Sequence, residues 1–191
     1  TGAFVLRLLP DGTPDTSFGP FADGLAFFGQ FPIPSSTLTT TNPQSVKILD
    51  TGEIVVGGFL NNAGWGSFVA RFTENGLLDT AFNGSGIFLL LASVWSYDWA
   101  GFIEVDRFGN VYLLSRAGGQ FNSCVVTKLN RYGQIDTGYG TSGHTILNPP
   151  AGDFYNCGSI AAASHGGMAI AVMDRSVSYT HLRAHETPIN L

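Results

Sequence analysis

One segment of fifteen residues occurs three times along the chain, at Phe4–Phe18, Phe68–Phe82 and Val125–Tyr139. Each copy has an apolar run with one cation, a glycine turn, an Asp-Thr pair and, two residues later, an aromatic ring. The turn glycines of successive copies are 64 and 57 residues apart. A period of this size predicts a repeat architecture in which each unit packs against its neighbours.

A second motif lies between the copies and is centred on Gly52, Gly109 and Gly166, which are spaced 57 and 57 residues apart. The seven extra residues of the first period therefore fall between Gly12 and Gly52. The Pro-, Ser- and Thr-rich stretch Pro32–Pro43 is predicted to be the loop that holds them.

The apolar runs are five to eight residues long and rich in Val, Ile, Leu and Phe, which favours strands over helices. Each period holds four such runs separated by turns, the pattern of one β-propeller blade. We therefore predict an all-β chain, a partial β-propeller of four-stranded antiparallel blades, with two full blades and two half blades. The predicted strands of the four blades are, in order: Phe4–Leu9 and Leu25–Phe31; Ser45–Asp50, Ile54–Phe59, Phe68–Thr73 and Ile87–Ser93; Gly101–Asp106, Val111–Ser115, Val125–Leu129 and Thr145–Leu147; and Ser159–Ala163 and Met168–Met173.

The repeated motif resembles the delta-60 repeat family, a bacterial propeller-type repeat, from about Phe4 to Met173. The third copy departs from it, with Lys128 in place of arginine and Gly138-Tyr139 in place of Ser-Phe. The resemblance implies a secreted or surface-attached bacterial protein and an extracellular or cell-surface location.

The repeat ends abruptly near the C-terminus. Val177–Thr187 resembles the translation of a transposase-type sequencing adapter, so residues 177–191 are expected to be an artefact and residues 1–176 a fragment of a repeat array. His181 and His185 lie in that segment and are not read as metal ligands. Thr1 begins without Met directly before a strand, so we expect an internal fragment with any signal peptide upstream.

Composition narrows the classes of partner. The chain is 44% hydrophobic, 12% charged and carries a net charge of −5, without a basic stripe, which argues against nucleic-acid binding. The sequence contains no run of 18 apolar residues, so it predicts no membrane-spanning helix. Cys124 and Cys157 leave two alternatives open, a disulfide or two separate buried thiols, and the second is the simpler prediction.

The repeated polar residues also allow two interpretations. The Asp residues are either cation ligands or caps of their own turns, and the Arg and Lys residues eight positions earlier either form an anion site or pair with those Asp residues within each blade. The aromatic rings either stack on sugars or anchor the loops by packing. We favour turn caps, within-blade pairs and anchors for these three sets: Asp15, Asp79 and Asp136; Arg7, Arg71 and Lys128; Phe18, Phe82 and Tyr139.

The candidate binding residues are Trp95, Tyr97, Asp98 and Trp99, which fall in an inter-strand loop and break the repeat pattern. Their chemistry suits a carbohydrate or protein ligand; the alternative, which we favour, is that they form a loop packed onto the barrel face. Apart from the His181-x-x-x-His185 spacing in the adapter-like segment, which we set aside, we identify no catalytic arrangement, cofactor motif or metal-ligand spacing. The predicted function is a non-enzymatic repeat scaffold for binding or display within a larger protein. The alternative is a fragment of a carbohydrate-active propeller enzyme whose catalytic residues lie on other blades.

Overall fold

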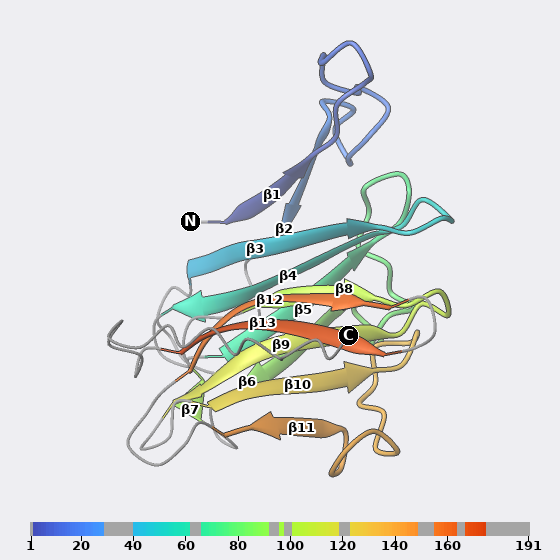
Figure 1. Cartoon of the computed structure of the whole chain (residues 1–191). Helices are drawn as coiled ribbons and strands as arrows, with labels where there is room; N and C mark the ends of the chain where they lie inside the picture. The colour runs from blue at the N-terminus through green and yellow to red at the C-terminus, as the bar shows by residue number, and fades with distance from the viewer. Residues whose placement is uncertain are drawn as a thin grey trace, which may run out of the picture.

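The computed structural model describes residues 2–28, 40–61, 66–91, 96–97, 101–118, 123–148, 155–163 and 167–174. This part of the chain contains thirteen strands and no helix, and all strand pairs are antiparallel (Figure 1).

The strands form four sheets, which we call blades 1 to 4 in chain order. Blade 1 is the hairpin of β1 (Ala3–Leu6) and β2 (Leu25–Phe28), and blade 4 is the hairpin of β12 (Tyr155–Ala162) and β13 (Met168–Asp174). Blade 2 has the order β3 (Thr40–Ile48), β4 (Ile54–Asn61), β5 (Gly66–Phe72) and β6 (Ile87–Leu91). Blade 3 has the order β8 (Phe102–Val105), β9 (Val111–Gly118), β10 (Ser123–Leu129) and β11 (His144–Leu147). The predicted two full and two half blades are confirmed.

The structure corrects two details of the strand prediction. Residues 40–43, predicted as the end of a loop, belong to β3, and the register with β4 shifts between Pro43 and Ser45. A bulge accommodates a proline because proline lacks the N–H that a regular ladder requires. A short strand that was not predicted, β7 (Ser96–Tyr97), pairs with the far end of β9.

Both faces of the central blades are buried, which explains why their strands read as continuous apolar runs. Along β4, Ile54 and Val56 pack toward blade 1, whereas Val55 between them packs toward blade 3. Along β9, Leu113 packs toward blade 2 and Leu114 toward blade 4. Successive side chains of a strand point to opposite faces, so one strand supplies two interfaces.

The first strands of blades 2, 3 and 4 are neighbours in space, because β8 contacts both β3 and β12. Gly58 and Gly101 permit the close approach of blades 2 and 3 here. A Cβ at Gly101 would lie 2.3 Å from the Gly58 backbone, which no larger residue can tolerate without a shift of the chain. This arrangement is the one expected when the first strand of each blade lies nearest the axis of a propeller.

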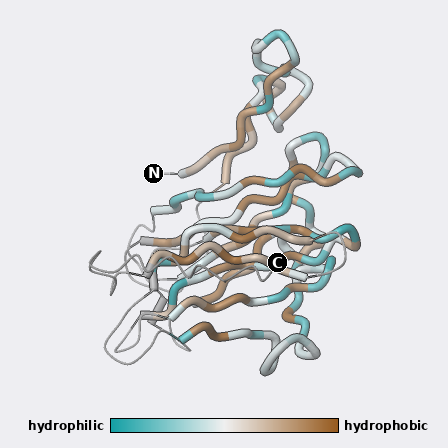
Figure 2. Tube along the Cα trace, viewed as in Figure 1, coloured by the Kyte–Doolittle hydropathy of each residue, from teal (hydrophilic) through white to brown (hydrophobic). Residues whose placement is uncertain are grey.

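The glycine turns of blades 2 and 3 lie on the right side of Figure 1, and we call this side the turn end. It comprises the turns around residues 50–52, 74–76, 107–109 and 131–133, while the loop of blade 1 that follows β1 lies at the top of the picture. Figure 2 shows hydrophilic segments at these turns and hydrophobic segments within the sheets. Gly52 and Gly109 have φ values of 90° and 81°, a left-handed conformation that glycine adopts without steric cost.

Candidate functional site

The repeated cation and the repeated Asp form one ion pair in each of blades 1 to 3. The carboxylate oxygen lies 2.8 Å from Arg7 Nε in blade 1, 2.7 Å from Arg71 Nε in blade 2 and 2.8 Å from Lys128 Nζ in blade 3. The predicted within-blade pairs are confirmed. The pairs close the loop between the third and fourth strands onto the third strand.

The second oxygen of each Asp caps its own turn. Oδ1 accepts a hydrogen bond from the backbone N–H two residues later, at 2.9 Å for Asp15, 3.0 Å for Asp79 and 3.2 Å for Asp136. The Ser17 hydroxyl and N–H, followed by the Arg7 charge, hold the pKa of Asp15 below its usual value. The hydrogen bond from Lys128 likewise lowers the pKa of Asp136. Turn caps, the favoured interpretation of these residues, therefore describe the observed contacts.

The arginine of one blade also binds the glycine turn of the next blade, a contact that sequence reasoning missed. Arg7 Nη1 donates to the carbonyl oxygen of Glu74, and Arg71 Nη1 donates to the carbonyl oxygen of Arg131 at 2.5 Å. These partners are 67 and 60 residues apart in sequence. One guanidinium therefore joins a loop of its own blade to a turn of the neighbouring blade.

The repeated phenylalanine makes the same inter-blade contact by packing. Phe18 and Phe82 are fully buried, and the guanidinium carbons of Arg7 and Arg71 lie 4.6 and 4.8 Å from the centroids of their rings. A Cβ at Gly133 would lie 2.9 Å from the Phe82 ring, so this turn must carry glycine for the ring to seat.

Backbone hydrogen bonds complete the contact. Gly19 N–H donates to Asn75 O at 3.0 Å, and Asn83 N–H donates to Tyr132 O at 2.7 Å. We call this unit of cation, Asp and aromatic ring on one blade, together with the glycine turn of the next, the latch. The prediction that the rings anchor loops by packing is confirmed for Phe18 and Phe82.

A groove of about 910 Å³ lies at the turn end between blades 2 and 3. Blade 2 contributes Lys47–Thr51, Glu53, Arg71, Thr73, Glu74, Asp79 and Ala81; blade 3 contributes Glu104–Gly109, Arg131 and Tyr132. Two ion pairs lie within it, Arg71–Asp79 of the latch and Lys47–Glu104, whose Nζ and Oε2 atoms are 2.8 Å apart. Groups of His, Cys, Asp and Glu able to hold a metal ion are absent from the described ranges.

The predicted binding residues are largely outside the described part of the chain. Trp95, Asp98 and Trp99 lie outside it, and Tyr97 is described only as backbone, in β7, opposite Ala117 of β9. The binding role of these four residues stays a prediction.

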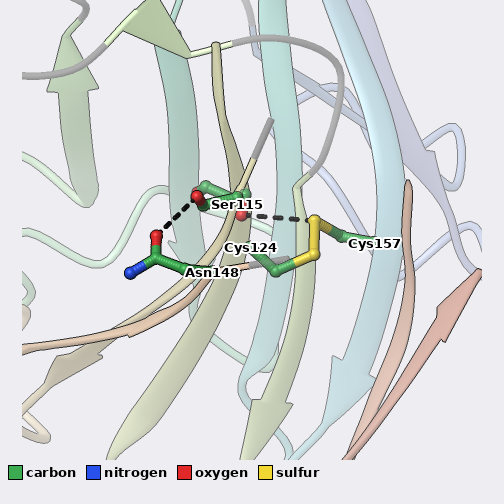
Figure 3. The surroundings of a disulfide bond; sticks show 5 residues. Ser115, Cys124, Asn148 and Cys157 are labelled. Atoms are coloured by element: carbon green, nitrogen blue, oxygen red, sulfur yellow. Dashed lines mark hydrogen bonds between the residues drawn. A yellow bond between two sulfur atoms is a disulfide. The ribbon is translucent and has the colours of Figure 1, made fainter. Parts of the chain in front are cut away.

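Cys124 of β10 and Cys157 of β12 form a disulfide between blades 3 and 4, so the simpler prediction of two separate thiols was wrong (Figure 3). Their Cα atoms are 5.8 Å apart although 33 residues separate them in sequence. The Cys157 sulfur lies 3.6 Å from the Ser115 carbonyl oxygen, and nearby the Ser123 hydroxyl donates to Asn148 Oδ1 at 2.8 Å. The third strand of one blade and the first strand of the next meet here, which spacing in sequence alone did not reveal.

One histidine of blade 3 is held in a partly buried position. Nδ1 of His144 lies 2.9 Å from the Thr127 hydroxyl on the neighbouring strand. Burial lowers the pKa of His144 because it disfavours the charged ring.

In the described part of the chain, no helix is long and apolar enough to cross a membrane.

Comparison with known proteins supports the fold. A family model described as "Domain of unknown function (DUF5122) beta-propeller" matches residues 1–18 and 50–82. These ranges hold the first two copies of the repeated fifteen-residue segment and strand β4, which lies between them. No curated protein and no solved structure matches the chain. The narrower resemblance to the delta-60 repeat stays a prediction. The chain is similar to a β-propeller family over these two segments, and its fold is the all-β, four-stranded-blade architecture of that class.

Proposed function

We propose that this chain is a non-enzymatic repeat scaffold for binding or display, and part of a larger secreted or cell-surface bacterial protein. The observation that carries the proposal is the latch. In blades 1 and 2 the recurring arginine joins its own loop carboxylate to a turn of the next blade, as Arg71 does with Asp79 and the Arg131 carbonyl. Recurrent chemistry therefore serves assembly, and positions that differ between blades are left to contact ligands.

An open apolar face on blade 1 supports the larger array. Phe4, Leu6 and Leu8 are 54%, 44% and 52% exposed, whereas the residues 64 positions later are buried to 1% or less: Phe68, Ala70 and Phe72. Blade 1 itself covers those later residues, with its Phe28 ring centroid 5.8 Å from that of Phe68. We propose that a preceding unit of the same kind covers the exposed set in the same way.

The disulfide supports the proposed location. Disulfides persist in secreted and surface proteins and are rare where cytosolic thiol systems keep cysteines reduced. The Cys124–Cys157 bond ties two blades together, so its formation in an oxidising compartment would stabilise the array.

The proposal is tested by separating retention from turnover. The purified chain is assayed against polysaccharide and peptide panels, with affinity electrophoresis or peptide arrays for retention and reducing-end and mass-spectrometric assays for products. The scaffold proposal expects retention of at least one ligand class without product release. Product release in proportion to protein concentration, or no retention on either panel, would contradict it.

A further inference from the structure

The groove between blades 2 and 3 has walls of opposite charge, although the walls come from equivalent positions of the repeat. Asp50 and Arg107 are 57 residues apart, and so are Glu74 and Arg131. Each pair occupies the same place in its blade, so the backbone is repeated while the sign of the side chain is reversed. In a repeat whose other turn residues serve assembly, such a reversal points to ligand contact.

The blade 3 wall carries two arginines and two aromatic rings, beside one carboxylate, Asp106, which accepts hydrogen bonds from the backbone N–H groups of Phe108 and Asn110. The guanidinium carbon of Arg107 lies 4.7 Å from the centroid of Phe108, and that of Arg131 lies 4.9 Å from the centroid of Tyr132. Both rings are exposed, and neither arginine is paired with a carboxylate among the described residues. A guanidinium stacked on a ring keeps its N–H edges free to bind a carboxylate.

The blade 2 wall is acidic. Asp50, Glu53 and Glu74 line it, and none of them has a cationic partner within the described ranges. Glu74 lies against the neighbouring turn of its own blade, where a Cβ at Gly52 would be 3.0 Å from Glu74 Cβ. The groove also holds two ion pairs, Lys47–Glu104 and Arg71–Asp79, and within each pair the two opposite charges neutralise each other. Among the described residues, the groups left without an ion-pair partner are Arg107, Arg131 and Asp106 on blade 3, with a net positive charge, and the three carboxylates on blade 2, so a ligand meets net charges of opposite sign on the two sides.

We propose that this groove binds an extended peptide segment in which acidic and basic residues alternate; the inference rests on the proposed scaffold function. Side chains of an extended chain point alternately to opposite sides, so strict alternation places the acids toward Arg107 and Arg131 and the bases toward Asp50 and Glu74. Aliphatic stems of the acidic side chains contact the exposed Phe108 and Tyr132 rings. An anionic polysaccharide presents the same sign to both walls and is repelled by blade 2.

The test uses two capped, fluorescent peptides of about eight residues, roughly 26 Å when extended. One alternates Glu and Lys, and the other repeats Glu-Glu-Lys-Lys. The two have the same composition and net charge, but only the first has one sign on each side. Fluorescence anisotropy with the whole chain is expected to show roughly tenfold tighter binding of the alternating peptide, from several exposed charge pairs of ordinary strength. Added salt is expected to reduce the difference.

Matched variants assign the effect to the walls. R107Q with R131Q removes two positive charges from the groove and is expected to abolish the preference. Q134E with T137E changes the net charge by the same amount at exposed positions of blade 3 that do not line the groove, and is expected to keep it. Melting curves verify that both variants fold.

A charge reversal and its compensation give the sharpest comparison. R107E with R131E makes both walls acidic, so the alternating peptide is lost and oligolysine is gained. Adding D50K with E74K reverses the sign of charge on both walls. Binding of the alternating peptide is then expected to return, because the peptide can rotate about its long axis and present its acidic side to the other wall. A fourfold variant that stays inactive while folded overturns the proposal.

Other outcomes separate this proposal from the one on which it rests. Equal binding of the two peptides, or preferential binding of polygalacturonate, overturns the peptide assignment. If no product is released and another ligand from the panels is retained elsewhere, the scaffold function stands and the groove proposal fails. Product release removes the scaffold function itself, whatever the peptides do.

Discussion

Replacement of Phe82 by alanine tests the latch most directly. Phe82 is fully buried, lies beneath Arg71 and fills the space beside Gly133 of the next blade. Loss of a buried phenylalanine side chain costs about 3–5 kcal/mol in transfer and cavity terms. This is a large part of the roughly 5–15 kcal/mol that stabilises a typical domain. Urea unfolding of the whole chain measures the loss from the midpoint and slope.

The control is Phe108→Ala, which removes the same side chain at a position that is 64% exposed. It is expected to change the free energy of unfolding by less than about 0.5 kcal/mol. Should Phe82→Ala fail to fold, Phe82→Leu provides a milder perturbation of the same contact. A loss below about 1 kcal/mol for Phe82→Ala would refute the reasoning, because a ring that joins two blades cannot be removed so cheaply.

Hydrogen exchange then distinguishes an inter-blade role from packing within one blade. The Asn83 N–H donates to the Tyr132 carbonyl of blade 3, so its protection depends on the two blades staying together. In Phe82→Leu this amide is expected to exchange faster, while amides in the middle of β9 stay protected. Unchanged protection at Asn83 would place the ring in its own blade only.

Three further predictions concern the other contacts. Arg71→Met is expected to destabilise the chain by roughly 1–3 kcal/mol in urea unfolding, since it leaves Asp79 Oδ2 and the Arg131 carbonyl oxygen without the donor that Arg71 supplies. Arg107→Met, at an exposed position without an ion-pair partner in the described ranges, is expected to be nearly neutral. Replacing Cys124 and Cys157 together by serine removes a link across 33 residues and is expected to lower the free energy of unfolding by about 3–4 kcal/mol. Thermal melting compares the variant with the oxidised and the reduced wild type. Equal melting temperatures of the oxidised and reduced wild type would contradict the prediction. Burial lowers the pKa of His144, so the unfolded chain binds the proton more readily than the folded chain. The free energy of unfolding is therefore expected to fall as the pH drops below about 6.5. His144→Gln is expected to weaken this dependence on pH, and an unchanged dependence would exclude this ring as its cause.

The accuracy of the sequence-based predictions depends on the range of each contact. The pairing of Arg71 with Asp79 was predicted because eight residues and one glycine turn bring two positions of the same loop together. The hydrogen bond from Arg71 to Arg131 was not predicted, because its partner lies on another blade. The repeat did carry a signal for it: each latch ring is followed about one period later by a turn glycine, the place where the ring seats.

The repeat spacing alone determined the four-strand unit, the antiparallel order within it and the burial of both faces, because these follow from periodicity and local turn chemistry. Tertiary structure decided which units touch and through which atoms: the disulfide between blades 3 and 4, the latches between blades 1 and 2 and between blades 2 and 3, and the two walls of the groove. The physical reason is that distances between blades are set by how sheets stack, and a linear spacing does not encode the separation of groups on two different sheets.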